Sequence, residues 1–133
     1  MEILENSAAR LTLRSSTAGV TCKIYTFDKV FGNFHVERKW SFMRPKPDQV
    51  ILDTYFEKEK RVSQRKVNDV PLSEISVVKH NSGDDKDEDG NSYIYHSLVC
   101  VLKSGEFFGL MQGTNSALCE TLRNTIADFL QLT

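Results

Sequence analysis

The chain has 133 residues, of which 40% are hydrophobic and 26% are charged, a balance typical of one globular domain and not of a disordered chain. Its formal net charge of −1 argues against a dedicated nucleic-acid-binding protein, which carries a clear basic excess. No apolar run approaches the roughly 20 residues of a membrane helix, and the acidic first residues do not resemble a secretory signal. We therefore expect a cytoplasmic protein without a transmembrane segment.

The cysteine pattern points to the same compartment. Three cysteines, Cys22, Cys100 and Cys119, are widely spaced, and no Cys-x-x-Cys pair is present. An odd, dispersed set does not form a disulfide framework or a zinc motif. We expect reduced thiols, with Cys100 packed in the core because it lies in the apolar run SLVCVL.

The first half of the chain reads as strands. Residues 10–14 alternate apolar and polar, and residues 21–27 and 34–40 flank the turn sequence DKVFGN, which predicts a hairpin. Arg38 interrupts the apolar row of the second hairpin strand, which we interpret as a charged residue on an edge strand. The sequence RPKP at residues 44–47 should break regular structure. We expect two strands joined by a charged turn between residues 49 and 67.

The second half begins with PLSEI, which leads into a strand at residues 75–80 and then an acidic loop. Two further strands should follow within residues 92–111, with a tight turn at Ser104-Gly105 or Gly105-Glu106. The last segment predicts an amphipathic helix from Ala117 to about Gln131, capped by Asn115 or Ser116. Its predicted apolar face consists of Leu118, Leu122, Thr125, Ile126, Phe129 and Leu130.

These elements predict an α+β fold that is mostly antiparallel β, a bent sheet or half-open barrel capped by one C-terminal amphipathic helix. The segments YTFDKVFGNFHVERKW, PLSEI, YIYHSLVCVLKSGEFFGL and IADFL resemble small bacterial, often cyanobacterial, proteins of pleckstrin-homology-like type. The resemblance covers most of residues 10–132 and implies a single domain with an insertion at 41–68. Related proteins carry a membrane hairpin where this chain has only SSTAGVTCKIY, so the resemblance implies a version without that hairpin.

The acidic loop opens like an EF-hand calcium loop, with Asp85, Asp87, Asp89 and Gly90 at matching positions. The twelfth position is His96, a poor substitute for the bidentate glutamate that calcium requires, and the flanking segments read as strands. The pattern therefore disfavours calcium and favours an acidic hairpin loop. His80 and His96 flank this loop and would lie opposite each other if the strands pair, but two histidines more often form surface contacts than a metal site.

The basic residues Lys58, Lys60, Arg61, Arg65 and Lys66 are the candidate partner contacts. Glu57 and Glu59 interrupt them, so a solvated face is the simpler interpretation, with peripheral membrane contact left open. Lys29, Arg38 and Trp40 lie near the spacing of a phosphoinositide motif, but Trp40 replaces its second arginine. The resemblance therefore does not extend to that ligand.

No phosphate loop, nucleophile elbow or catalytic cluster is recognisable, so we expect no enzymatic activity and no cofactor. The favoured hypothesis is a protein-interaction module or adaptor that acts in the assembly or stability of a membrane-associated complex and binds its partner through a sheet edge or loop. The segment 41–68 is the candidate contact surface. The alternative hypothesis is a small barrel that carries a pigment or lipid.

Overall fold

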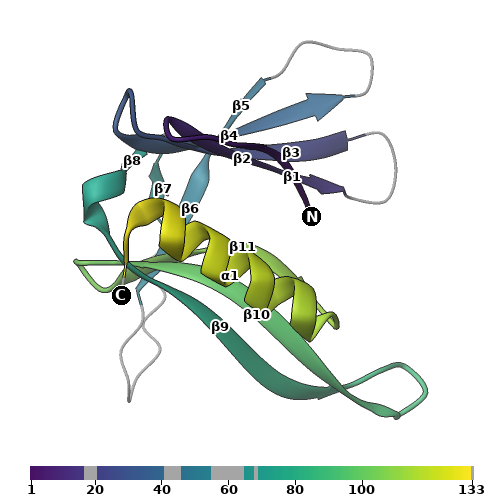
Figure 1. The fold of residues 1–133 in the computed structure, drawn as a ribbon. Coiled ribbons are helices and arrows are strands. Elements are labelled where there is room, and N and C mark those ends of the chain that lie inside the picture. The colour runs from purple at the N-terminus through teal and green to yellow at the C-terminus, as the bar shows by residue number, and fades with distance from the viewer. Residues whose placement is uncertain (17–20, 41–45, 55–64, 68, 133) are drawn as a thin grey trace.

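A computed structural model describes residues 1–16, 21–40, 46–54, 65–67 and 69–132 (Figure 1). Antiparallel strands form two sheets, and one helix follows them at the C-terminal end. This confirms the predicted fold class, and the two sheets do not close into a barrel in the described part of the chain. No helix among the described residues has both the length and the apolar character needed to cross a membrane.

The N-terminal sheet has the order β1-β2-β3-β4-β5, and β8 also pairs with β4. The predicted hairpin is its centre, because β3 and β4 pair in register from Thr21 opposite Trp40 to Asp28 opposite Asn33. A strand that we did not predict, β1, pairs with β2 at the edge of the sheet. The strands of this sheet are β1 (Glu2–Asn6), β2 (Arg10–Ser16), β3 (Thr21–Asp28), β4 (Asn33–Trp40), β5 (Lys46–Asp48) and β8 (Asp69–Pro71).

The second sheet has the order β7-β6-β11-β10-β9. The predicted strand pair within residues 49–67 is confirmed by β6 and β7, while the turn between them lies outside the described residues. A 3-10 turn, η1 (Leu72–Glu74), leads from β8 into this sheet. Its strands are β6 (Val50–Thr54), β7 (Arg65–Val67), β9 (Ile75–Lys86), β10 (Ser92–Leu102) and β11 (Glu106–Gly113).

Strand β4 is an interior strand, which corrects two expectations. Arg38 pairs with Lys23 of β3 on one side and with Lys46 of β5 on the other, so it is not on an edge strand. The RPKP sequence does not end all regular structure either, because Pro47 lies within β5. β5 is the last strand of the sheet order, where a proline is tolerated because an edge strand has a neighbour to pair with on one side only.

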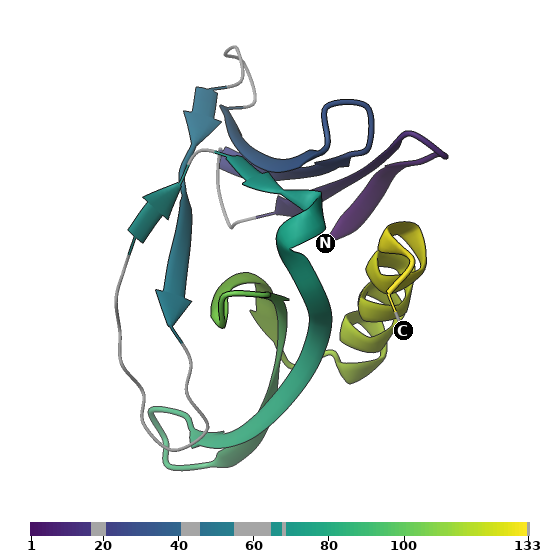
Figure 2. The ribbon, with the colours of Figure 1, turned by 90° about the vertical axis from the view of Figure 1, so that its left-hand side faces the viewer.

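The helix α1 (Ser116–Leu130) confirms the predicted C-terminal helix. The Asn115 side chain accepts a hydrogen bond from the Leu118 N–H, as expected of an N-cap, and the left-handed Gln131 ends the helix. The helix packs against β9 and β10, beneath the N-terminal sheet in both views (Figures 1 and 2). Its buried side chains are Cys119, Leu122, Ile126 and Phe129.

The core is one cluster of apolar side chains supplied by both sheets and the helix. Strand β6, from the segment interpreted as an insertion, contributes Val50 and Leu52 to it and lies between β7 and β11. The largest fully buried side chains include Phe27, Phe34, Leu11, Leu13, Leu52, Leu98, Leu122 and Ile126. Cys100 is also fully buried, as predicted.

The acidic region is shorter as a loop than we expected. Asp84 and Asp85 belong to β9, where they pair with Ile94 and Tyr93 of β10, and the far ends of these two strands extend past α1 (Figure 1). Pairing with β10 thus continues β9 well beyond the predicted end at residue 80. At the other end of β10, the turn into β11 places Gly105 at φ +88°, a conformation that favours glycine.

Candidate functional site

The turn between β3 and β4 presents the two most exposed large hydrophobic side chains in the described part of the chain. Val30 is 67% exposed and Phe31 is 76% exposed. Exposed aromatic residues of this kind are characteristic anchors of protein interfaces. We name residues 28–33 the Val30–Phe31 turn.

Asp28 holds this turn in one conformation. Its Oδ1 accepts hydrogen bonds from the N–H groups of Val30 at 2.8 Å and Phe31 at 3.1 Å, and its Oδ2 accepts one from Arg10 Nε at 3.1 Å. Burial alone would raise the pKa of this carboxyl, but the two N–H groups and the Arg10 guanidinium outweigh burial and lower the pKa. Asp28 is therefore an ionised anchor, and Gly32 at φ +73° completes the reversal.

Contacts from three other elements fix the position of the turn. The Lys29 N–H donates to the Ala9 carbonyl between β1 and β2, and the Leu72 N–H of η1 donates to the Gly32 carbonyl. The Lys29 ammonium lies 4.4 Å from the centre of the Phe129 ring near the end of α1, at cation–π distance. The two exposed side chains thus project from a turn that is tied to the rest of the fold.

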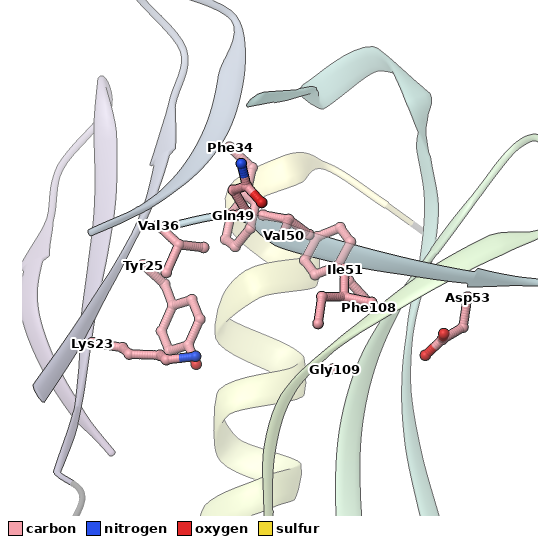
Figure 3. Close-up of a pocket in the computed structure, with 10 residues that line it drawn as sticks. All are labelled: Lys23, Tyr25, Phe34, Val36, Gln49, Val50, Ile51, Asp53, Phe108 and Gly109. Atoms are coloured by element: carbon pink, nitrogen blue, oxygen red, sulfur yellow. The ribbon is translucent and has the colours of Figure 1, made fainter. Parts of the chain in front are cut away.

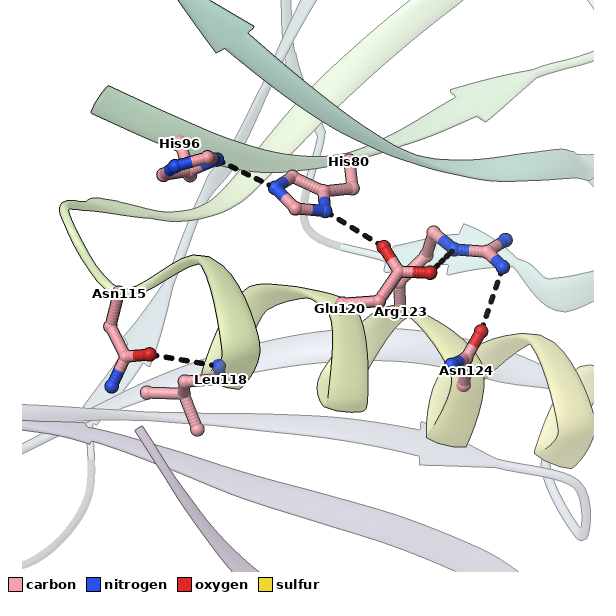
Figure 4. Close-up of polar contacts among 7 residues, drawn as sticks. All are labelled: His80, His96, Asn115, Leu118, Glu120, Arg123 and Asn124. Atoms are coloured by element: carbon pink, nitrogen blue, oxygen red, sulfur yellow. Dashed lines mark hydrogen bonds and ion pairs between the residues drawn. The ribbon is translucent and has the colours of Figure 1, made fainter. Parts of the chain in front are cut away.

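A second cluster connects the second sheet to α1 (Figure 4). His80 Nε2 lies 2.8 Å from His96 Nδ1, and His80 Nδ1 lies 2.8 Å from Glu120 Oε2. Glu120 also accepts a hydrogen bond from Arg123 Nε at 3.3 Å. The two histidines are diagonal neighbours and not opposite each other as expected, because His80 is opposite Leu98.

The charge of Glu120 sets the proton arrangement in this cluster. Hydrogen bonding from His80 lowers the pKa of Glu120 most strongly, burial opposes this, and Arg123 lowers it further. The carboxylate is a pure acceptor, so His80 Nδ1–H donates to it. In the neutral pair, His80 Nε2 then accepts from His96 Nδ1–H, which leaves the lone pair on His96 Nε2.

A pocket of about 280 Å³ lies where the two sheets meet (Figure 3). Its aromatic wall consists of Tyr25, Phe34 and Phe108, with ring centres 6.1 Å apart for the first pair and 4.6 Å apart for the second. Lys23 and Asp53 lie on opposite sides of it in this view. The other lining residues are Val36, Gln49, Val50, Ile51 and Gly109.

Of the two ionisable side chains of this pocket, Lys23 has a partner of opposite charge and Asp53 has an oxygen without a hydrogen-bond partner. Lys23 Nζ lies 3.3 Å from Asp48 Oδ2, so its charge is already compensated. Asp53 Oδ1, in contrast, is buried and has no hydrogen-bond partner among the described residues. A buried polar atom without a partner is unusual in a native protein and asks for an explanation.

The candidate partner contacts from the sequence are only partly visible. Lys58, Lys60 and Arg61 lie outside the described residues. Arg65 and Lys66 are both exposed on β7, and Arg65 Nη2 forms an ion pair with Glu106 Oε1 at 2.7 Å.

The residues considered for a phosphoinositide site are not brought together. Lys29 lies in the Val30–Phe31 turn, whereas Arg38 is opposite Lys23, toward the other end of the hairpin. Arg38 lies five residue steps along the extended strand from Asn33, the first residue of β4, which corresponds to roughly 17 Å.

In the acidic turn, the carboxylates of Asp85 and Asp87 accept hydrogen bonds from nearby backbone N–H groups. Asp87 Oδ1 accepts hydrogen bonds from the N–H groups of Asp89 and Asn91, and Asp85 Oδ1 accepts one from the Lys86 N–H. Among the described residues, no group of three or more histidine, cysteine or acidic side chains is arranged to hold a metal ion. The three cysteines are free thiols.

Two features of these sites escaped the sequence interpretation. Two large apolar residues inside a turn, Val30 and Phe31, were a signal of exposure that we interpreted only as a turn. Nothing in the sequence indicated that Glu120 would meet His80, because that contact depends on how α1 packs.

Comparison with protein-family models, with curated proteins and with solved structures gives no match for this chain. The resemblance to pleckstrin-homology-like proteins therefore stays a prediction.

Proposed function

We propose that this chain is a non-enzymatic protein-interaction module that binds a partner protein through the Val30–Phe31 turn. The observation that carries the proposal is a rigid turn with two apolar side chains that are 67% and 76% exposed. Because the turn is already ordered by Asp28 and Gly32, a partner would not have to offset the entropy of ordering it.

The energy available fits one anchor of a protein interface. Full burial of a Val or Phe side chain contributes about 1.5–3 kcal/mol, so the exposed parts of Val30 and Phe31 offer about 1–2 kcal/mol each. Residues that contribute about 2 kcal/mol or more dominate typical interfaces. The pair can therefore act as one hot spot when an apolar pocket of the partner receives it.

The same energy is too small for a membrane anchor. A single myristoyl chain, with about 0.8 kcal/mol per buried CH₂, gives only marginal membrane binding, and basic residues must supplement it. The turn itself contains one basic residue, Lys29, whose ammonium lies over the Phe129 ring. A protein partner is therefore favoured over a lipid surface.

The nature of the partner follows from the resemblance alone. Relatives with a membrane hairpin direct the search toward a membrane-associated complex, in whose assembly or stability this chain would act as an adaptor. This step is an analogy, and a fold does not determine a function.

The test compares the wild-type chain with a Val30→Asp/Phe31→Asp variant in the source cells. Both carry a tag, and proteins captured from membrane and soluble fractions are quantified. The matched control is Leu4→Asp, which places a charge on a side chain that is 44% exposed on β1. We expect a partner that the control retains and the double variant loses, with affinity for the purified partner reduced about 30-fold or more, as the loss of a 2 kcal/mol hot spot implies.

The altered residues are exposed, so circular dichroism and thermal unfolding should be unchanged in all variants. A partner that binds the double variant as tightly as the wild type would contradict the proposal. A partner lost instead by charge reversal at Arg65 and Lys66 would move the contact to the predicted basic segment.

The hypothesis of a pigment or lipid carrier draws no support from the pocket between the sheets. Its volume of about 280 Å³ lies just below the range of about 300–1,000 Å³ that is usual for ligand pockets.

A further inference from the structure

We propose that Lys23, Arg38 and Lys46, three basic residues in line across the N-terminal sheet, bind a linear oligophosphate anion. The ligand is a chain of phosphoryl groups, supplied either by a nucleoside triphosphate or by inorganic polyphosphate. We name these three side chains the basic row. It lies toward the end of the β3–β4 hairpin that is opposite the Val30–Phe31 turn, so the proposal does not depend on the function proposed for that turn.

Strand pairing places the three cations in line. Lys23 of β3 is directly opposite Arg38 of β4, and Arg38 is directly opposite Lys46 of β5. Directly opposite residues share a face of the sheet, and neighbouring strands are about 4.8 Å apart, so the basic row extends over roughly 10 Å. Ser15 of β2 is opposite Lys23 and adds a hydroxyl group at one end. An elongated anion can contact the whole row, whereas a single compact anion cannot.

The charge of the ligand follows from the balance of charges around the basic row. Like charges directly opposite each other destabilise an antiparallel pair, so this arrangement does not favour folding by itself. Lys23 Nζ lies 3.3 Å from Asp48 Oδ2, and it is the one member of the row that forms an ion pair within the described residues. Asp53 lies on the opposite side of the pocket from Lys23 (Figure 3).

The carboxyl group of Asp48 compensates only part of this charge. Burial raises its pKa, but hydrogen bonds from the Gln49 N–H and from Lys23, together with the charge of Lys23, outweigh burial and lower the pKa. The charge of Arg38 lowers this pKa further. Three cations therefore face one ionised carboxylate, which leaves an excess of two positive charges. A multivalent anion compensates this excess.

The basic row is accessible to a ligand. The side chain of Lys23 is 44% exposed, and Arg38 and Lys46 are exposed residues. An ammonium group has three N–H donors and a guanidinium group has five, and their hydrogen bonds to phosphate oxygens are charge-assisted. Successive phosphoryl groups can therefore bind along the row without any rearrangement of the core.

Trp40 provides a way to distinguish the two sources of the phosphoryl chain. It is two residues beyond Arg38 on β4, so both side chains are on the same face of the sheet, and Trp40 is half-buried. A nucleobase can stack on an accessible indole ring, whereas inorganic polyphosphate has no group that would do so.

The first experiment compares four anions by calorimetric titration into the full chain, without divalent cations and at one ionic strength. Tripolyphosphate should bind saturably, and orthophosphate and a tetraglutamate peptide should bind about tenfold or more weakly. The fourth probe, ATP, separates the sources. Tighter binding of ATP than of tripolyphosphate, lost in Trp40→Leu, indicates a nucleotide, and equal or weaker binding of ATP indicates the inorganic chain.

Two variants with the same loss of charge complete the test. Arg38→Gln removes the central cation of the row and should bind tripolyphosphate about tenfold or more weakly. It should also unfold at a higher urea concentration than the wild type in the absence of ligand, because the like-charge contacts are removed. Lys39→Gln is the matched control, since Lys39 is the next residue of β4, opposite Cys22 on the other face of the sheet, and its affinity should equal that of the wild type.

Three results would each overturn the proposal. The first is no saturable heat with tripolyphosphate, and the second is equal binding of orthophosphate or of the tetraglutamate peptide. The third is an equal loss of affinity in Arg38→Gln and Lys39→Gln, which would mean that only the net charge matters. The Val30→Asp/Phe31→Asp variant should bind tripolyphosphate normally, so failure of this proposal is distinguishable from failure of the interaction module.

Discussion

The contact between His80 and His96 should stabilise the folded chain. Their ring nitrogens lie 2.8 Å apart, so one imidazole donates its N–H to the lone pair of the other. A hydrogen bond of this kind contributes about 0.5–1.5 kcal/mol to the free energy of unfolding.

A double-mutant cycle measures this contribution directly. His80→Ala, His96→Ala and the double variant are unfolded in urea, and the fluorescence of Trp40, the sole tryptophan, reports the transition. We expect a favourable coupling free energy of about 1 kcal/mol between the two histidines.

The control pairs His80→Ala with His35→Ala. His35 is on β4 of the other sheet, opposite Thr26, so this pair should show no coupling. The reasoning is refuted if the coupling between His80 and His96 is no larger than that of the control pair, because the 2.8 Å contact would then contribute nothing in solution.

Three further predictions concern stability and reactivity. Leu122→Ala should lower the free energy of unfolding by about 2–5 kcal/mol in thermal or urea unfolding, because Leu122 is 1% exposed. The control is Asn124→Ala on the exposed side of α1, which should change the free energy of unfolding by less than about 0.5 kcal/mol. The lowered pKa of Asp28 means that its ionised form stabilises the fold above the unfolded pKa of about 3.9, so stability should fall as the pH drops through the lower folded value. Urea unfolding between about pH 5 and 2 should show this loss in the wild type and a smaller loss in Asp28→Asn; equal losses would count against the anchor role. A thiol reagent should modify Cys22, which is partly exposed, well before Cys100, whose pKa is raised by complete burial; faster reaction of Cys100 would mean that the core opens readily.

Local sequence predicts best the elements whose ends are marked by capping or turn residues. The Asn115 cap and the three- and four-residue spacing of Leu122, Ile126 and Phe129 are enough to place α1. Asp28 and Gly32 likewise mark the turn between β3 and β4, because both residue types favour a reversal of the chain. Such signals act within a few residues, so they do not depend on tertiary contacts.

The elements that were missed or shortened depend on partners distant in sequence. Strand β1 is exposed at every residue, so its sequence lacks the buried alternation that identifies a strand, and only pairing with β2 forms it. Asp84 and Asp85 have low strand propensity, yet pairing with β10 keeps them in β9.

The candidate sites follow the same division. The proximity of His80 and His96 was predictable from strand pairing, although their diagonal placement depends on the register. The contact of Glu120 with His80 depends on how the helix packs on the sheet. Asp53 Oδ1 has no hydrogen-bond partner among the described residues. This depends on which residues surround β6, so no local sequence pattern indicates it.

Strand β4 receives two strands along one edge, and this arrangement bears on how the protein can change over evolution. Asn33, Phe34 and His35 pair with β8, and the next three residues pair with β5. The chain thus leaves the N-terminal sheet and returns to it at adjacent positions of a single strand. β4 holds the two ends of the excursion between β5 and β8 at adjacent positions, but the excursion also contains β6, whose Val50 and Leu52 belong to the core. Descendants of this chain can therefore change that excursion while the paths before β5 and after β8 stay the same, provided that Val50 and Leu52 of β6 keep their places in the core.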